Sequence, residues 1–133
     1  MIVGLPPTTK SLTNVQVKSE IGIIEEARMI TALVQFKLPG PISREKACEI
    51  FSSTAPRYRE TPGLIRKYYI LSEDGATAGG VYLWKSREDA RRLYTSEWEA
   101  FILDKYGARP SVVYFDSPVV VDNVTGEIVA DDD

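Results

Sequence analysis

The sequence predicts an α+β protein of the ferredoxin-like class, with the element order βαββαβ, an antiparallel sheet and helices on one face of that sheet. Three observations predict this class. Segments rich in β-branched and aromatic residues alternate with segments of helical periodicity over residues 30–121. Glycine and proline separate most of these segments. The chain has 133 residues, of which 44% are hydrophobic, so it can form one domain with a core but not two.

A strand and a helix begin the predicted unit. Residues 30–38 are rich in β-forming side chains, and the Pro-Gly-Pro sequence at residues 39–41 ends the strand. Ser43 is a suitable N-cap for the helix, and Pro56 is expected to kink it. The apolar positions of this helix follow helical spacing: Ala47, Ile50, Phe51, Thr54, Ala55 and Tyr58.

A hairpin is predicted next. Pro62 and Gly63 make a turn into a second strand at residues 64–71. The Glu-Asp-Gly sequence at residues 73–75 then turns the chain into a third strand at residues 77–85. These two strands are therefore expected to be antiparallel neighbours.

A second helix and a fourth strand complete the order. Residues 86–89 have the form of a capping box, and we expect one helix that ends before Gly107 and Pro110. Residues 111–115 predict the fourth strand, and residues 119–121 a further short strand. The apolar face of the second helix comprises Ala90, Leu93, Tyr94, Trp98, Phe101, Ile102 and Tyr106.

The two ends of the chain differ from this central unit. Residues 1–28 show no clear periodicity and are predicted to be an N-terminal extension of a domain at residues 29–126. Residues 127–133 end in three Asp residues and are predicted to be an acidic tail, frayed beyond Val129. If residues 1–28 are an appendage, deleting them leaves the domain folded.

Both faces of the predicted sheet are apolar. On the third strand, Tyr82 and Trp84 lie on one face and Val81 and Leu83 on the other. Sheets with one wet face usually alternate apolar with polar residues, so the face without helices is also expected to be buried. A chain this short has no third layer to cover it. We therefore predict a homodimer with the two sheets face to face and the helices outside.

The composition excludes several classes of function. Because the chain has no His, Ser-His-Asp catalysis and His-ligated zinc or haem are excluded. The single Cys48 excludes an internal disulfide and multi-cysteine metal sites, so we predict no metal and no cofactor. No signal sequence and no membrane-spanning apolar run is evident, so we predict a cytoplasmic protein without a membrane partner.

Nucleic acid is not an expected partner. The net charge is −3 and the isoelectric point is near 5.1, which disfavours binding to phosphate backbones. RNA-recognition domains share this topology, but aligning Trp84 with their last motif aromatic places Gly79 and Val81 at the two base-stacking positions. Bases would have no aromatic platform there.

Aromatic residues gather on the side of the predicted sheet that faces the helices. Aromatic residues at this spacing most often form plain core, but their polar atoms need partners and several together can line a pocket for a flat phenolic ligand. The adjacent Gly79 and Gly80 favour a pocket, since missing side chains in a strand indicate close approach or empty space. The candidate substrate-binding residues are Tyr58, Tyr82, Trp84, Tyr94 and Trp98.

Two residues of the second strand are candidates for chemistry. Lys67 and Arg66 lie on opposite faces, so one of them points to an interior or to the dimer seam. Lys67 is either an edge-strand charge that reaches water or, with Tyr69, a group that stabilises a substrate anion. Glu97 and Glu99 on the second helix are either solvated or a base with a raised pKa.

Several short sequences together resemble the YdhR-like monooxygenase family of the dimeric α+β-barrel superfamily. The resemblance spans residues 30–123. It implies a homodimer whose two four-stranded sheets close into a barrel, with one pocket per subunit between sheet and helices. The matching sequences are Pro-Gly-Leu-Ile at residues 62–65 followed by Lys67, residues 79–84 with Ser86 and Ala90, and Tyr-Phe-Asp-Ser-Pro at residues 114–118.

The resemblance implies two alternative functions. The absence of His speaks against the haem-degrading enzymes and cyclases of the superfamily, which use a His. What fits is a cofactor-independent monooxygenase of an electron-rich quinol or anthrone-like aromatic, which the protein would desolvate and orient. The alternative is a non-catalytic protein that binds a small apolar metabolite in the same cavity. A purely structural partner with a filled layer is a third interpretation.

Overall fold

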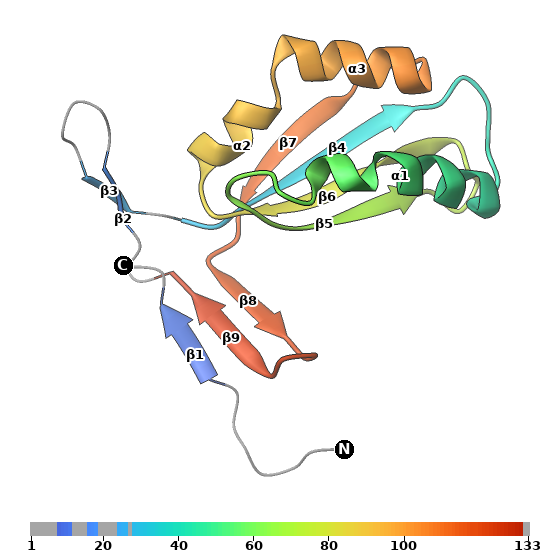
Figure 1. The fold of residues 1–133 in the computed structure, drawn as a ribbon. Helices are drawn as coiled ribbons and strands as arrows, with labels where there is room; N and C mark the ends of the chain where they lie inside the picture. The colour runs from blue at the N-terminus through green and yellow to red at the C-terminus, as the bar shows by residue number, and fades with distance from the viewer. Residues whose placement is uncertain (1–7, 12–15, 19–23, 27, 132–133) are drawn as a thin grey trace.

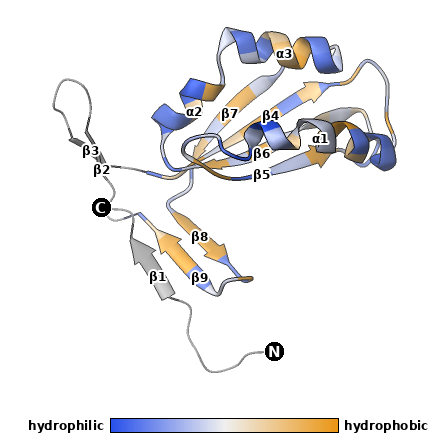
Figure 2. Cartoon of the chain, viewed as in Figure 1, coloured by the Kyte–Doolittle hydropathy of each residue, from blue (hydrophilic) through white to orange (hydrophobic). Residues whose placement is uncertain are grey.

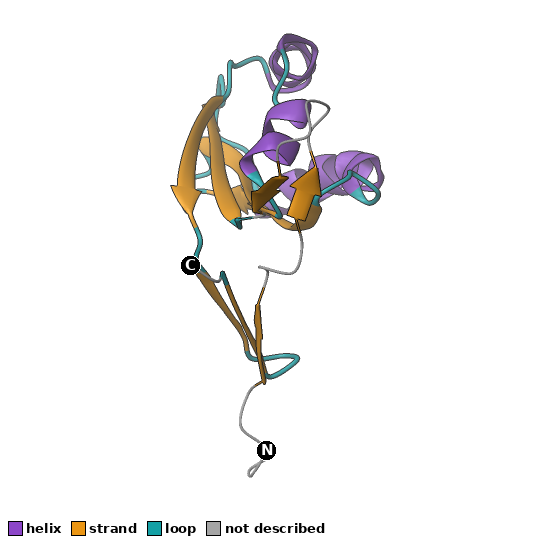
Figure 3. Ribbon diagram, turned by 90° about the vertical axis from the view of Figure 1, so that its left-hand side faces the viewer, coloured by secondary structure: helices purple, strands orange, loops and turns teal. Residues whose placement is uncertain are grey.

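The computed structural model describes residues 8–11, 16–18, 24–26 and 28–131. Its centre is a four-stranded sheet with the order β5-β6-β4-β7, in which every neighbouring pair is antiparallel. The helices lie on one face of this sheet (Figures 1 and 3). The predicted ferredoxin-like α+β class is therefore confirmed. The strands are β4 (Ile30–Lys37), β5 (Leu64–Leu71), β6 (Thr77–Trp84) and β7 (Ser111–Asp116), and the helices are α1 (Arg44–Tyr58), α2 (Arg87–Leu93) and α3 (Ser96–Tyr106).

The core lies between the sheet and the helices. Alternate residues of the central strands point into it, and Ala32 of β4 stands opposite Tyr82 of β6 in the register. Hydrophobic residues are concentrated in the strands, whereas the helices carry many hydrophilic residues (Figure 2). The largest fully buried side chains are Trp84, Tyr82, Met29, Ile30 and Val34.

Helix α1 begins as predicted and ends two residues after its proline. The Ser43 hydroxyl accepts a hydrogen bond from the Lys46 backbone N–H at 3.0 Å, which caps the helix. The helix continues past Pro56 to Tyr58. Pro56 lies in the last turn, so few intrahelical bonds remain for it to disrupt.

The predicted second helix is in fact two helices, and this expectation was wrong. Helix α2 ends at Leu93, its C-cap residue Tyr94 has a ψ of 63°, and α3 starts after Thr95. The Thr95 hydroxyl accepts from the Trp98 backbone N–H at 3.2 Å and so serves as a second N-cap. A continuous apolar periodicity runs through both helices, and it masked this local capping signal.

Two small sheets lie outside the central one. Strands β1 (Thr8–Ser11), β9 (Glu127–Ala130) and β8 (Val119–Asp122) form one, with β9 in the middle (Figure 1), and β2 (Gln16–Lys18) pairs with β3 (Ile24–Glu26). The short strand predicted at residues 119–121 is thus present as β8. The chain does not fray at Val129, because β9 continues to Ala130 and the Asp131 backbone N–H donates to the Pro118 carbonyl at 2.9 Å. The domain boundaries at residues 28 and 126 stay predictions.

The sheet face without helices carries partly exposed apolar side chains. Tyr68 is 55% exposed, Val113 46% and Phe115 52%. Val81 and Leu83 on the same face are half-buried. This face therefore has the apolar character that the sequence predicts.

Candidate functional site

The five predicted pocket residues meet in one aromatic layer between sheet and helices. Tyr82 and Trp84 come from β6, and their rings stack at 6.1 Å between centroids with an interplanar angle of 4°. Tyr94, at the end of α2, packs edge-on against both at 5.4 and 5.8 Å. Trp98 of α3 lies 4.8 Å from Tyr94, and Tyr58 of α1 lies 6.0 Å from Tyr82.

Polar atoms in this layer are hydrogen-bonded to each other. The Trp98 indole N–H donates to the Tyr58 hydroxyl at 3.2 Å, and the Trp84 indole N–H donates to the Tyr94 hydroxyl at 3.1 Å. Burial raises the pKa of both Tyr82 and Tyr94 well above the usual tyrosine range. These phenols are therefore neutral at physiological pH and form a packed, internally satisfied layer.

Lys67 projects from β5 into a box of three tyrosine rings. Its Nζ lies 3.4 Å from the centroid of the Tyr58 ring, 3.8 Å from that of Tyr69 and 4.6 Å from that of Tyr82. No carboxylate of the described residues forms an ion pair with it. Ring faces favour a cation, whereas burial disfavours it and lowers the pKa of Lys67 to about 7.

Gly80 makes room for this box. A Cβ at Gly80 would lie 2.9 Å from Cε1 of Tyr82 and 3.1 Å from Cε of Lys67. Gly79 has a different cause, because a Cβ there would collide with the Val34 carbonyl oxygen on the neighbouring strand. Close approach, and not an empty pocket, therefore accounts for both glycines of this pair.

Tyr69 forms one wall of the box and is held from two sides. Its hydroxyl shares a hydrogen bond of 2.8 Å with the Thr54 hydroxyl on α1, and its ring stacks on Phe51 at 4.8 Å. Burial raises the pKa of Tyr69. Arg66 points to the opposite face, as predicted, and pairs with Asp122 of β8 at 2.8 Å. The cation that enters the interior is therefore Lys67.

The layer is nearly filled. A cavity of about 10 Å³ remains beside Lys67, enough for one water, and its lining includes Tyr58, Tyr69 and Tyr82. Trp84, Tyr94 and Trp98 do not line this cavity. Of the five predicted pocket residues, Tyr58 and Tyr82 therefore line this small cavity. Glu97 and Glu99 are exposed, which matches the solvated interpretation.

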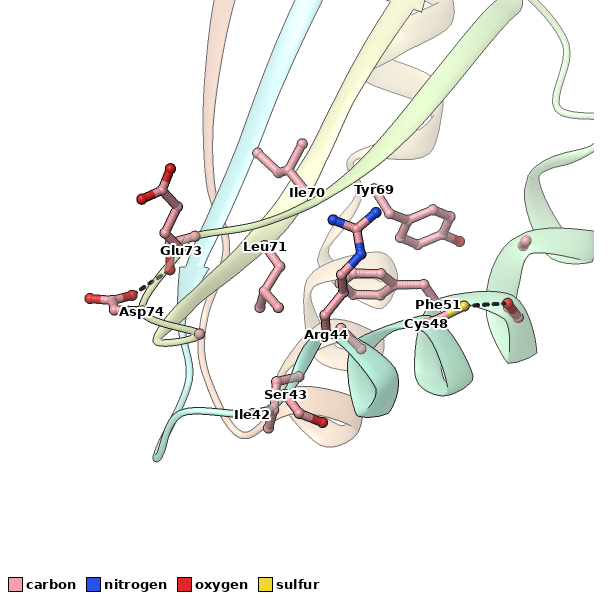
Figure 4. Close-up of a pocket in the computed structure, with 15 residues that line it drawn as sticks. Ile42, Ser43, Arg44, Cys48, Phe51, Tyr69, Ile70, Leu71, Glu73 and Asp74 are labelled. Carbon is pink, nitrogen blue, oxygen red and sulfur yellow. Dashed lines mark hydrogen bonds between the residues drawn. The ribbon is translucent and has the colours of Figure 1, made fainter.

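A much larger groove lies on the outer side of Tyr69. It encloses about 790 Å³ between the first turns of α1 and the end of β5 with its following turn (Figure 4). Tyr69 lines both this groove and the small inner cavity. The groove could not be predicted from periodicity, because its walls come from residues 42–55 and 69–75 and a local sequence pattern does not show that these two segments are neighbours.

Within the described part of the chain, no group of three or more Cys, Asp or Glu side chains is arranged to hold a metal ion. Among those residues, no helix has the length and apolar character needed to cross a membrane.

Comparison with solved structures identifies proteins with this fold. SnoaB from Streptomyces nogalater, described as a cofactor-independent oxygenase, has a TM-score of 0.52 at 19% identity, over 68% of this chain and 94% of its own. The ActVA-Orf6 monooxygenase of Streptomyces coelicolor, in complex with nanaomycin D, has a TM-score of 0.51 at 20% identity, over 68% and 88%. Protein SO0527 from Shewanella oneidensis has a TM-score of 0.53 at 13% identity, over 69% of this chain and 93% of its own. At these identities the similarity is one of fold.

Sequence comparison gives the family. No curated protein matches the chain significantly. Residues 32–109, which are more than half of the chain and include Lys67 and the aromatic layer, match the family described as "Putative mono-oxygenase ydhR". We conclude that the chain belongs to the YdhR monooxygenase family.

Proposed function

We propose that this protein is a cofactor-independent monooxygenase that oxidises an electron-rich aromatic molecule of the quinol or anthrone type. The observation that carries the proposal is the position of Lys67, an amine with a pKa of about 7 that faces three tyrosine rings and has no carboxylate partner among the described residues. Such an amine is partly neutral at physiological pH and can take a proton. SnoaB and ActVA-Orf6, which share the fold, support the oxygenase class.

In the proposed reaction Lys67 removes a proton from an acidic C–H or O–H of the substrate. The resulting anion transfers an electron to O₂, and the two radicals combine to a peroxide, which takes the proton back from the Lys67 ammonium. Loss of water then leaves a carbonyl. For an anthrone, one oxygen atom enters the product, the other leaves as water with the two hydrogens of the CH₂ group, and no external reductant is consumed.

Lys67 and Tyr69 have different roles in this proposal. The Lys67 ammonium formed by proton transfer lies in low-dielectric surroundings, where it stabilises a nearby anion more strongly than it would in water. Tyr69 stays protonated because burial raises its pKa, so its O–H can donate a hydrogen bond to the same anion. Tyr58 and Tyr82 complete the box and exclude water.

We further propose that the protein is a homodimer. The partly exposed Tyr68, Val113 and Phe115 on the helix-free face support a second copy there. In a dimer with two-fold symmetry the same face of each subunit packs against its copy, so one contact buries this face in both subunits.

Oxygen uptake with 1,8-dihydroxyanthrone tests the activity. We expect consumption of one O₂ per anthraquinone formed, faster than the uncatalysed rate, and at least a tenfold loss of kcat in Lys67→Met. The exposed Lys85→Met variant is the control and should keep full activity. Absence of turnover above background across a panel of anthrones and quinols would contradict the proposal.

A second candidate function is binding without catalysis. It is favoured by the groove of about 790 Å³, whose lining does not include Lys67. A binding protein would gain thermal stability from an aromatic compound that it leaves chemically unchanged, whereas the enzyme would convert it. Product analysis after the thermal-shift experiment distinguishes the two.

A further inference from the structure

The groove outside Tyr69 has the walls of a binding site for a flat molecule. Ile42, Phe51, Ala55 and Leu71 contribute apolar surface, and Tyr69 closes its inner end (Figure 4). Its volume of about 790 Å³ lies within the range of about 300–1,000 Å³ typical of small-molecule sites. By contrast, the inner cavity holds no more than a water.

Charged residues stand at both ends of the groove. Arg44 extends from the first turn of α1 towards Tyr69 and lies across the apolar wall (Figure 4). Its guanidinium has no ion-pair partner among the described residues. Glu73 and Asp74 also line the groove, and Figure 4 shows their carboxylates at the end remote from Tyr69, where Asp74 accepts a hydrogen bond from the Ser72 hydroxyl at 2.6 Å. Arg44 is therefore available to an acidic group bound at the Tyr69 end of the groove.

Tyr69 lies between the groove and Lys67. Its ring stacks on Phe51 and lines both the groove and the inner cavity, and the centroid of the Tyr69 ring is 3.8 Å from Nζ of Lys67. A ligand in the groove thus lies one side chain away from the proposed reacting amine.

We propose that the groove between α1 and β5 binds the ring system of a planar aromatic anion, an aromatic carboxylate or an ionised phenol, with Arg44 facing its acidic group. The ring system lies against Phe51 and Leu71. The identification of this ligand as substrate rests on the proposed function, whereas the binding site itself does not.

Binding of 1-hydroxy-2-naphthoate, a fluorescent aromatic carboxylate, tests the site. We expect saturable binding to the wild type and about tenfold weaker binding to Arg44→Gln. The affinity of the same variant for the neutral analogue 1-naphthol should change by less than twofold. Lys46→Gln is the matched control, since it removes the same charge from the same helical turn outside the groove and should change affinity by less than twofold. Equal losses in the two variants would overturn the role of Arg44.

Two adjacent serines locate the ligand. Ser52 and Ser53 are both exposed on α1, but only Ser52 lines the groove. Ser52→Trp should weaken naphthoate binding at least fivefold, whereas Ser53→Trp should leave it unchanged. The single Cys48 also lines the groove and is exposed, so bound naphthoate should slow its reaction with a thiol reagent.

The outcomes separate this proposal from the proposed function. Groove-dependent binding without oxygen uptake supports the site and contradicts the monooxygenase. Oxygen uptake with anthrone that is insensitive to Ser52→Trp, together with unprotected Cys48, overturns the groove and leaves the oxygenase standing.

Discussion

Lys67 is subject to two opposing influences that decide its chemistry. Three tyrosine faces attract its ammonium, while burial without a carboxylate partner among the described residues disfavours the charge. Burial lowers the pKa of Lys67 to about 7. A lysine with the usual, unshifted pKa would carry a proton at all physiological pH values and could not act as a base.

The lowered pKa of Lys67 predicts a pH-dependent stability. Between pH 7 and 10.5 the unfolded chain holds a proton on this amine that the folded protein has lost, so the free energy of unfolding rises with pH over that window, by at most about 1.4 kcal/mol per pH unit. Below pH 7 both states are protonated and the full penalty remains. Replacing Lys67 with Met removes this dependence.

Urea unfolding at pH 6, 8 and 9.5 measures the effect. We expect the stability gained by Lys67→Met over the wild type to be largest at pH 6 and to shrink towards pH 9.5, which stays below the usual titration of tyrosine. Lys85→Met serves as the exposed comparison and should show no such trend. A gain that does not vary with pH would contradict the lowered pKa.

At the scale of elements, the break between α2 and α3 shapes the aromatic layer. At this break Tyr94 faces Trp84, and the Tyr94 hydroxyl accepts a hydrogen bond from the Trp84 indole N–H. Thr95 then caps the helix on which Trp98 is buried, with 2% of its surface exposed. A continuous helix would have kept Tyr94 in helical register with Trp98, four residues later. The short local cap therefore determines where two layer residues lie.

We expect removal of the Thr95 cap to lower the stability of the protein measurably. Thr95→Ala leaves the Trp98 backbone N–H without its partner and should lower the free energy of unfolding by roughly 1 kcal/mol. Thr95→Asn, which can also cap, should retain most of the stability. Denaturant unfolding monitored by tryptophan fluorescence gives both values, and equal stability of Thr95→Ala and the wild type would refute the capping role.

At the scale of the whole molecule, helices cover one face of the sheet, and among the described residues no helix lies on the other face. The helix-free face exposes half of the Tyr68 and Phe115 side chains to solvent. Burying such area stabilises an association by about 25 cal/mol per Å² before the entropic cost. The physical argument for the proposed dimer is this uncovered apolar area.

A charge on this face should separate the proposed dimer. In Phe115→Glu each symmetric contact buries two new carboxylates, so we expect sedimentation at micromolar concentration to show a monomer. Val124→Glu is the control, because Val124 is 97% exposed in the turn before β9 and should leave the dimer intact. A wild-type protein that sediments as a monomer would refute the dimer directly.

The sequence by itself determined the order of the elements and the faces of the strands. Turn residues and periodicity are local signals, so β4 to β7, the N-cap at Ser43 and the convergence of Tyr58, Tyr82 and Trp98 could all be predicted. The absence of His likewise limits the available chemistry without any coordinates.

Only the tertiary structure decided how much space these side chains leave and what surrounds Lys67. A cavity is the volume that residues from distant elements fail to fill, and no local pattern records it. Tyr58 and Tyr82 line a cavity of only about 10 Å³, while Phe51 and Tyr69, 18 positions apart, stack beside an outer groove of about 790 Å³. The lowered pKa of Lys67 has the same origin, since burial depends on packing between α1, β5 and β6 and not on neighbours in the chain.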